Sequence, residues 1–505
     1  MNALPQLLPE DDWNRRLLAN VHPADWKNPR PAPRYNLVVL GAGTAGLVCA
    51  AGAAGLGARV ALVEPHLLGG DCLNYGCVPS KALIASSRVR SDVLAGRHFG
   101  ITAGEAAVEF PRVMERLRRL RAEISHHDSV QRLSGLGVDV FLGQGRFRDD
   151  SSVEVDGAVL RFSRAVIATG ARAAVPPIPG LDQADFVTNE TVFSLTELPP
   201  RWLVLGGGPI GCELAQALAR LGAKVTLVEM GPRLLPKDDP EAAAIIARAL
   251  GDDGVELVLN STVLSVSRDS GTNRVQVRSG QEVVERQVER ILVAAGRLPN
   301  VTGLGLEQAG VRYDRLKGIV VNDRLQTTCP RIYAAGDVAM TYKFTHTADA
   351  AARLVIQNAL FAGSRRLSSL IVPWCTYTSP EVAQVGITEA EAAERGIPTT
   401  TIKIPFQQVD RAVLEGDAGG FLKVYLKRGT DQILGATVVD RDAGNLISEI
   451  TLAMTCGIRL ARLADVIHPY PTRAEAVRKA ADAYNRTRLT PWVKRLMGLW
   501  FRWTR

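Results

Sequence analysis

Two stretches of the chain, residues 35–64 and 202–229, carry the same order of apolar and small residues. Each begins with a short apolar run, continues through a glycine-rich loop and a segment of small residues, and ends in a second apolar run. Short apolar runs that alternate with helical segments are typical of strand–loop–helix–strand units in a parallel sheet. The pattern therefore predicts an α/β fold that contains two Rossmann-like units.

The segments outside these units have other patterns. Residues 1–33 are interrupted by prolines and charged clusters, which predicts an extension outside the first domain. Residues 111–134 are rich in arginine and have the spacing of a long amphipathic helix, and residues 138–168 indicate short strands. The last part of the chain has an α+β pattern, with strands expected near 372–378, 421–427 and 433–439 and helices near 443–456 and 474–488.

Both glycine loops match the fingerprint of dinucleotide-binding units. The first glycine of such a loop permits a tight turn, the second lets the backbone approach a pyrophosphate, and the third lets helix and strand pack closely. An acidic residue at the end of the next strand accepts hydrogen bonds from the adenosine ribose. Two loops in this context, each followed by its acid, favour nucleotide binding over glycine turns without a ligand. The residues are Gly41, Gly43, Gly46 and Glu64 in the first unit, and Gly206, Gly208, Gly211 and Glu229 in the second.

The acid of the second unit bears on the choice of nicotinamide. The carboxylate of Glu229 would repel the negatively charged 2′-phosphate of NADPH. NADP sites usually offer arginine at this place instead. Arg233 lies four residues further along the chain and would weaken that repulsion. We therefore expect NADH as the reductant, with NADPH as the alternative.

A cysteine pair follows the first unit. Cys72 and Cys77 lie five residues apart at the predicted start of a helix, where they can close a short disulfide loop. A helix N-terminus and the nearby Lys81 would lower a thiol pKa. The alternative is half of a zinc site, but no second Cys or His cluster supplies the remaining ligands. Seven cysteines are too sparse for a structural disulfide framework, so we expect a redox-active pair and no bound metal.

The segment 69–81 that holds this pair, together with four shorter motifs, resembles the FAD-dependent pyridine nucleotide–disulfide oxidoreductases of class I. The resemblance extends over residues 34–490. It implies a FAD-binding domain at 34–172 and 301–366, an NAD(P)H-binding domain at 173–300 and a dimerisation domain at 367–490. An N-terminal extension at 1–33 and a basic amphipathic tail at 491–505 would flank them. The shorter motifs are 168–170, 295–300, 332–337 and 377–383.

The same resemblance implies roles for individual residues. Cys77 would lie against the flavin, and Cys72 would exchange electrons with the substrate. Lys81 would lie near the flavin and pair with Glu213. The residues implied for FAD are Gly41, Gly43, Gly46, Glu64, Gly70, Lys81, Thr169, Gly170, Arg297, Gly336 and Asp337, and those for NAD(P)H are Gly206, Gly208, Gly211, Glu229 and Gly296.

The C-terminal motif bears on the electron acceptor. Disulfide-reducing members of the family carry a catalytic His five residues before a Glu, but here the position five before Glu475 is Tyr470, and His468 falls two residues too early. An unperturbed phenol titrates near ~10 and an imidazole near ~6.5, so a phenol is a poor proton shuttle for thiols. Mercuric reductases resemble this chain in having Tyr there, and two thiolates suit a soft metal ion.

We therefore expect a mercuric reductase-like enzyme that reduces a metal ion or another small non-disulfide acceptor. Two departures count against mercury itself: no cysteine follows Cys456, and residues 1–33 contain no cysteine. A dihydrolipoamide dehydrogenase-like enzyme that uses His468 is the alternative. By the resemblance the protein is a homodimer, with Tyr470 and Glu475 acting on the partner's active site.

The net charge and the C-terminal tail bear on the partners and the location of the protein. A net charge of +8 over 505 residues fits a merely basic surface, and we expect no nucleic-acid partner. The first residues lack an apolar signal segment, so we expect a cytoplasmic protein. Residues 491–505 place apolar and basic side chains on opposite faces of a helix, which is typical of a helix in peripheral contact with the inner face of a membrane. One alternative is that this helix docks on its own dimer. Another is that the protein is a membrane-docked flavoprotein that delivers electrons to a membrane partner.

Overall fold

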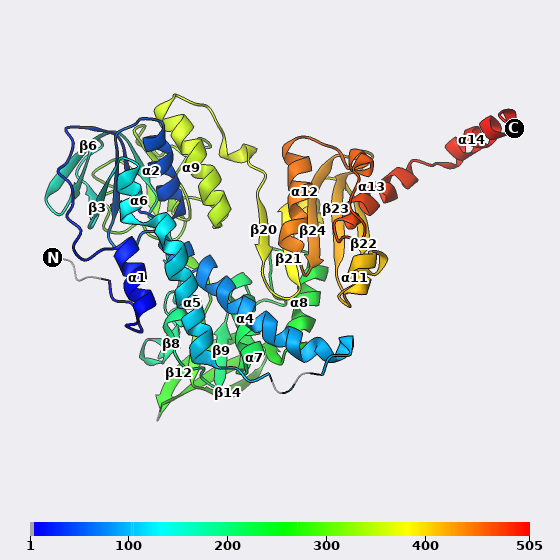
Figure 1. The fold of residues 1–505 in the computed structure, drawn as a ribbon, viewed down its shortest axis with the longest axis horizontal. Coiled ribbons are helices and arrows are strands. Elements are labelled where there is room, and N and C mark those ends of the chain that lie inside the picture. Colours follow the sequence, from blue (N-terminus) through cyan, green and yellow to red (C-terminus); the bar gives the residue numbers. More distant parts are fainter. Residues whose placement is uncertain (1–4, 103, 105, 270) are drawn as a thin grey trace. The chain divides into compact units, whose positions relative to one another are not determined.

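The computed structural model describes residues 5–102, 104, 106–269 and 271–505. It divides the chain into two compact units, which are described separately (Figure 1). Unit 1 comprises Met1–Met230 and Gly254–Leu370, and unit 2 comprises Gly231–Asp253 and Ile371–Arg505.

The first sheet of unit 1 is built on the first predicted Rossmann-like unit. Its central strand β1 is parallel to β2 on one side and to β6 on the other, and β3 and β19 extend the parallel part. All five residues of β2 are buried, as expected for a parallel strand covered on both faces. The helices α2 and α9 pack against each other beside this sheet (Figure 1). The elements are β1 (Tyr35–Leu40), α2 (Thr44–Gly55), β2 (Val60–Glu64), β3 (Val138–Leu142), β6 (Ala158–Ile167), β19 (Ile332–Ala334) and α9 (Thr345–Leu360).

A second parallel sheet contains the other predicted unit. Its strand order is β11-β10-β9-β15-β8, and the helix α7 packs on β10. A three-stranded antiparallel sheet, β12-β13-β14, accompanies it. The predicted α/β fold with two Rossmann-like units is therefore confirmed. The elements are β8 (Phe186–Val187), β9 (Arg201–Leu205), α7 (Pro209–Leu221), β10 (Lys224–Val228), β11 (Val255–Val258), β12 (Ser261–Asp269), β13 (Thr272–Ser279), β14 (Glu282–Val288) and β15 (Arg290–Val293).

The N-terminal extension and the arginine-rich segment differ from the sequence pattern. Helix α1 (Asp12–Val21) buries Leu17 and Val21 in the hydrophobic core of the first sheet, so this part of the extension belongs to that core. The single long helix expected at 111–134 is wrong. Helix α5 (Phe110–Ile124) ends in a 3₁₀ turn, and the separate helix α6 (Val130–Gly135) begins beyond it with Ser129 as its N-cap.

Unit 2 is an antiparallel sheet of order β20-β21-β24-β23-β22, which the helix α12 contacts through β20, β21 and β24. Strands and helices lie where the pattern of the last part of the chain predicts them. The elements are β20 (Pro373–Thr376), β21 (Glu381–Gly386), β22 (Thr399–Pro405), β23 (Phe421–Lys427), β24 (Ile433–Asp440), α12 (Ala443–Thr455) and α13 (Glu475–Thr487).

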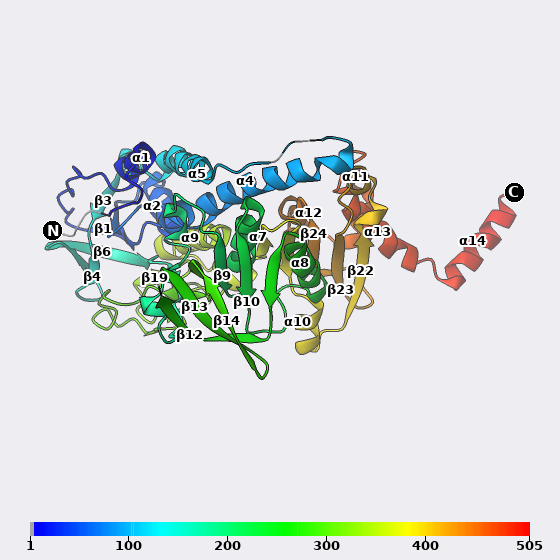
Figure 2. The same cartoon turned by 90° about the horizontal axis from the view of Figure 1, so that it is seen from below.

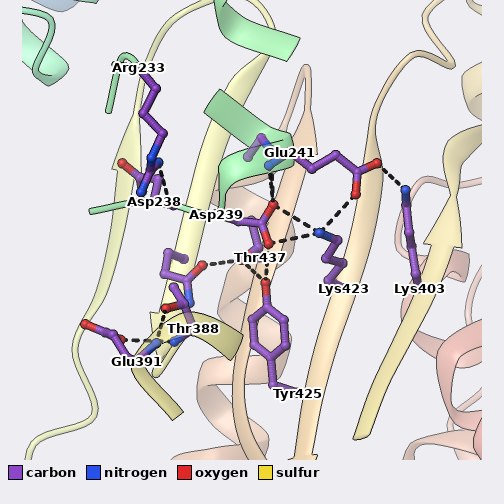
Figure 3. Close-up of polar contacts among 12 residues, drawn as sticks. Arg233, Asp238, Asp239, Glu241, Thr388, Glu391, Lys403, Lys423, Tyr425 and Thr437 are labelled. Carbon is purple, nitrogen blue, oxygen red and sulfur yellow. Dashed lines mark hydrogen bonds and ion pairs between the residues drawn. The ribbon is translucent and has the colours of Figure 1, made fainter. Parts of the chain in front are cut away.

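Helix α8 (Pro240–Asp252) also belongs to unit 2, although it lies within the range expected for nicotinamide binding. Its N-cap Asp239 accepts hydrogen bonds from the main-chain N–H groups of residues 241 and 242. The same carboxylate accepts from Lys423 Nζ and from Tyr425 Oη, both at 2.9 Å (Figure 3). Because both partners lie on β23, this buried network fastens the start of α8 to the sheet.

Candidate active site

The two glycine loops of unit 1 have nearly the same geometry. The first glycines, Gly41 and Gly206, have φ of +101° and +106°, a conformation in which an L side chain is strained. A Cβ on Gly46 would lie 1.8 Å from the carbonyl oxygen of Gly41, and the equivalent distance at Gly211 is 1.9 Å. Only glycine therefore allows these helices to begin so close to their loops.

The acidic residues close the two loops in the same way. Glu64 accepts a hydrogen bond of 2.7 Å from the N–H of Ala42, and Glu229 accepts one of 2.6 Å from the N–H of Gly207. Burial raises the pKa of Glu64 to about 6. At the helix starts, a Cβ on Gly208 would meet nothing within 4 Å, and a Cβ on Gly43 would meet only the Cα of Gly70, at 3.8 Å. Main-chain N–H groups at a helix N-terminus beside a fixed carboxylate fit a dinucleotide.

Further residues implied for FAD gather around the first loop. A Cβ on Gly70, at φ +56°, would lie 2.6 Å from the Cα of Gly43, so Gly70 allows the redox segment to approach the loop. Arg297 joins two carboxylates, at 3.0 Å from Asp71 and 3.2 Å from Asp337. Burial raises the pKa of Asp337.

Three other expected residues are glycines in turns. Gly170, Gly296 and Gly336 have φ of +66°, +117° and +80°. Thr169 donates a hydrogen bond of 2.7 Å to the carbonyl of Asn300, which joins the segments 168–170 and 295–300.

The cysteine pair lies where two short helical segments meet. Cys72 is on α3 (Gly70–Asn74) and is half-buried, while Cys77 is exposed at the first position of α4 (Cys77–Ala95). A hydrogen bond from the Cys72 thiol lowers the pKa of Cys77 to about 6, with further help from Thr345 and the charge of Lys81. The same pairing raises the pKa of Cys72. A lowered pKa at Cys77 beside a raised pKa at Cys72 suits thiol exchange.

Lys81 and Glu213 form an ion pair with Nζ and Oε2 2.9 Å apart. Glu213 lies on α7 and its side chain is 6% exposed, whereas Lys81 lies one turn beyond Cys77 on α4. Helices α4 and α7 pack along each other, so the pair joins the redox helix to the second Rossmann-like unit.

Sequence reasoning missed two groups of residues at this site. Thr345, the first residue of α9, lies 3.5 Å from Cys77 Sγ through its hydroxyl, and no motif marks it. Asp71 accepts a hydrogen bond from Asn189, and Arg121 donates to the carbonyl of Asn74, so polar contacts hold α3 from two sides. These contacts join positions more than forty residues apart, which local patterns do not reveal.

The C-terminal candidates lie in unit 2. Tyr470 is 70% exposed, and its hydroxyl donates a hydrogen bond of 2.8 Å to Asp410, which raises the pKa of the phenol. His468 has a side chain that is only 6% exposed, with Nε2 3.0 Å from Glu449. Glu475 Oε1 lies 3.5 Å from Lys479, and its buried Oε2 has no hydrogen-bond partner among the described residues.

Comparisons with known proteins agree with this architecture. Residues 35–352 match the family model described as pyridine nucleotide-disulphide oxidoreductase, and residues 372–481 match its dimerisation domain. A mercuric reductase of Streptomyces lividans is 36% identical over 89% of this chain and 96% of its own length. A dihydrolipoyl dehydrogenase of Thermus scotoductus is 36% identical over 90% of this chain and 98% of its own length.

A solved structure, the Cu(II) complex of the HOCl-induced flavoprotein disulfide reductase RclA from Escherichia coli, matches with a TM-score of 0.78. The two sequences are 30% identical, and the match covers 88% of this chain and 98% of the RclA chain.

The chain belongs to the pyridine nucleotide–disulfide oxidoreductases, which are FAD-dependent enzymes that use NAD(P)H. Its C-terminal sheet is the dimerisation domain of that family, which supports a homodimer. Across the described ranges, no cluster of three or more His, Cys, Asp or Glu residues is arranged to hold a metal ion. None of the helices in these ranges is both long and apolar enough to cross a membrane.

Proposed function

We propose that the enzyme transfers electrons from NADH to a thiophilic metal ion bound by Cys72 and Cys77. The observation that carries this proposal is the position of Tyr470 and His468. The residue five before Glu475 is an exposed phenol, and the only nearby imidazole is turned toward Glu449 with a side chain that is 6% exposed. The group that would protonate a departing thiolate is thus replaced by one with a raised pKa.

Proton balance separates the two classes of acceptor. NADH and a disulfide need one further proton to give NAD⁺ and two thiols, so an acid must deliver protons to sulfur. NADH and Hg(II) give NAD⁺, metallic mercury and one released proton, while the two mercury–thiolate bonds break and the metal gains two electrons. No proton has to be delivered to the reduced metal, so the second reaction does not require an imidazole beside the redox pair. A phenol near the thiolates can instead donate a hydrogen bond to them or act as a ligand.

The residues of the cysteine site have different roles in this reaction. When bound, FAD accepts a hydride from the nicotinamide and supplies two electrons to the sulfur pair. Lys81 and Thr345 stabilise the thiolate of Cys77, and Cys72 is the sulfur that meets the acceptor. Two thiolates are soft ligands that select soft metal ions. Tyr470 and Glu475 would reach this pair from the partner subunit of the homodimer.

Two further observations support the details of the proposal. The guanidinium of Arg233 donates to the carbonyls of Leu235, Pro236 and Asp238, which leaves it turned toward its own segment and favours NADH over NADPH. Relatives named for reduction of mercury and a structural relative solved with Cu(II) favour a metal acceptor.

The test compares acceptors and variants at one site. NADH oxidation is measured with Hg(II) as a dithiol complex and with lipoamide, for the wild type and for Tyr470→Phe and His468→Gln. We expect at least tenfold faster turnover with Hg(II) than with lipoamide, a loss of Hg(II) turnover in Tyr470→Phe, and no change in His468→Gln. Cys77→Ser serves as control, because it should abolish the long-wavelength thiolate–flavin absorbance of the reduced enzyme.

The alternative is a dihydrolipoyl dehydrogenase-like enzyme. One observation favours it: His468 and Glu449 form a paired imidazole and carboxylate, an arrangement that can serve acid–base catalysis. Faster turnover of lipoamide than of Hg(II), abolished by His468→Gln and kept by Tyr470→Phe, would replace our proposal by this one.

A further inference from the structure

The C-terminal helix α14 (Pro491–Trp503) contains no buried residue. In both views it projects away from the sheet of unit 2 and is connected to α13 by a short segment (Figures 1 and 2). Its large apolar side chains each expose between 45% and 78% of their surface. They are Trp492, Leu496, Met497, Leu499, Trp500, Phe501 and Trp503.

The two sides of α14 differ in chemistry. At 3.6 residues per turn, its apolar side chains occupy an arc of about 200°, and its basic side chains occupy the remaining arc. Six basic residues and no acidic residue lie between 483 and 505. Thr490 caps the helix by accepting from the N–H of Val493, and Pro491 follows at the first turn, so the sequence specifies where the helix begins.

We propose that α14 docks on the surface of a membrane that contains anionic phospholipid. A helix of 13 residues is about 20 Å long, which is shorter than the ~30 Å hydrocarbon core of a bilayer. The helix therefore lies in the plane of the interface, with its tryptophans at the level of the headgroups. The basic face stays in water and attracts the phosphate groups of the lipid.

Charge and composition favour lipid over a protein surface. Three of the seven tryptophans of the chain lie within these 13 residues, at Trp492, Trp500 and Trp503. Indole rings are enriched where an apolar body meets a wet, polar boundary. The uninterrupted positive charge from Arg486 to Arg505 complements a uniformly anionic layer.

The experiment uses the full-length, FAD-loaded protein and vesicles of phosphatidylcholine with or without 30% phosphatidylglycerol, as about one lipid in three is enough to give a negative surface. Co-sedimentation should be at least tenfold stronger with phosphatidylglycerol and should weaken as salt is raised. The variant Leu496→Glu/Trp500→Glu should lose binding, and Lys494→Glu/Arg502→Glu should lose only the preference for the anionic lipid. Leu316→Glu, at an apolar residue of unit 1 that is 73% exposed, is the matched control.

Two results would overturn the proposal. Equal co-sedimentation of the wild type and Leu496→Glu/Trp500→Glu would show that α14 does not carry membrane binding. The second result is that the wild type binds to neither kind of vesicle while Leu496→Glu/Trp500→Glu fails to form the dimer in analytical ultracentrifugation. In that case the apolar face of α14 docks on a second copy of the chain. NADH oxidation by the soluble variants shows that they are folded.

Discussion

Arg121 donates a hydrogen bond of 2.8 Å to the carbonyl of Asn74, a residue that lies between the two redox cysteines. The other nitrogen of this guanidinium donates to Asn14 Oδ1 at 2.6 Å, so α1 of the N-terminal extension is joined to α3 through one side chain. All three residues are buried. Asn74 in turn donates from its amide to the carbonyls of Leu68 and Gly70, which fixes the segment that carries Cys72.

We expect Asn14→Leu to destabilise the protein, because it removes an acceptor from a buried guanidinium. Burial lowers the pKa of Arg121 to about 10, which shows how far this guanidinium is removed from water and why its N–H groups need acceptors in the protein. Leaving a buried donor without its acceptor costs about 1–3 kcal/mol. Thermal unfolding of the FAD-loaded protein measures the loss. The exposed Asn445→Leu is the control, and an equal effect in both variants would contradict a specific role for Asn14.

Thr345→Ala should raise the pKa of Cys77. The hydroxyl lies 3.5 Å from Cys77 Sγ and favours the thiolate, so its removal weakens the charged form. One neutral hydrogen bond is worth about 1 kcal/mol, which corresponds to a rise of roughly half a unit to one unit. The measurement is the pH titration of thiolate absorbance in the reduced protein, with Cys77→Ser subtracted. Thr345→Ser keeps the hydroxyl and should titrate like the wild type; a shift in it as well would point to lost packing instead.

The Lys81–Glu213 pair should contribute separately to stability and to thiol chemistry. Lys81→Met removes a cationic partner of a buried carboxylate and should lower stability by ~1–3 kcal/mol, discounted for the partial exposure of Lys81. The double variant Lys81→Met/Glu213→Leu should recover much of that stability, because the buried carboxylate is removed together with the lysine. Both variants lack the positive charge that lowers the pKa of Cys77, so both should titrate at higher pH. Recovery of the thiolate pKa in the double variant would show that Glu213, not Lys81, governs it.

Local constraints explain which parts of the fold and of the site the sequence predicts. Gly41 and Gly206 need a backbone conformation that only glycine adopts easily, and the strands beside them are short buried runs. The cysteine pair lies within one contiguous segment, so its motif is visible in the sequence.

Other features depend on contacts between distant segments. Thr345 lies 268 positions from Cys77 in the sequence. In the sequence it is an ordinary residue at a helix start, and only the fold brings its hydroxyl close to the Cys77 sulfur. Arg118 and Arg121 belong to a helix whose many arginines indicate a solvated face, yet both are buried. Their partners lie on the N-terminal segment, where prolines and charged clusters predict an extension outside the first domain. Helix α8 likewise joins the C-terminal sheet through one carboxylate, which no periodic pattern shows.

Two adjacent aspartates of unit 2 should have opposite effects on stability as pH changes. Burial raises the pKa of Asp238 to about 6, and its Oδ1 accepts a hydrogen bond of 2.8 Å from Trp374 (Asp238 is labelled in Figure 3). For Asp239, burial acts in the same direction, but the hydrogen bond and charge of Lys423 outweigh it and lower the pKa.

The folded state therefore binds a proton at Asp238 that the unfolded state, with a pKa near ~3.9, has already released. This contribution to stability is complete below pH ~4 and is lost as the pH rises through about 6. Asp239 contributes in the other sense: its stabilisation is present above pH ~4 and is lost as the pH falls through its lowered pKa.

We expect Asp238→Asn to raise the melting temperature at pH 8, by the equivalent of ~1–3 kcal/mol, because the amide keeps the acceptor for Trp374 without a buried charge. Asp239→Asn should lower the melting temperature at the same pH, since Lys423 then loses its buried anionic partner. Calorimetry of both variants from pH 2 to 8 gives the two slopes, that of Asp239 below pH ~4 and that of Asp238 between pH ~4 and about 6. If Asp238→Asn shows the same pH dependence as the wild type between pH 4 and 6, the carboxyl of Asp238 does not titrate in that range and its proposed proton uptake on folding is wrong.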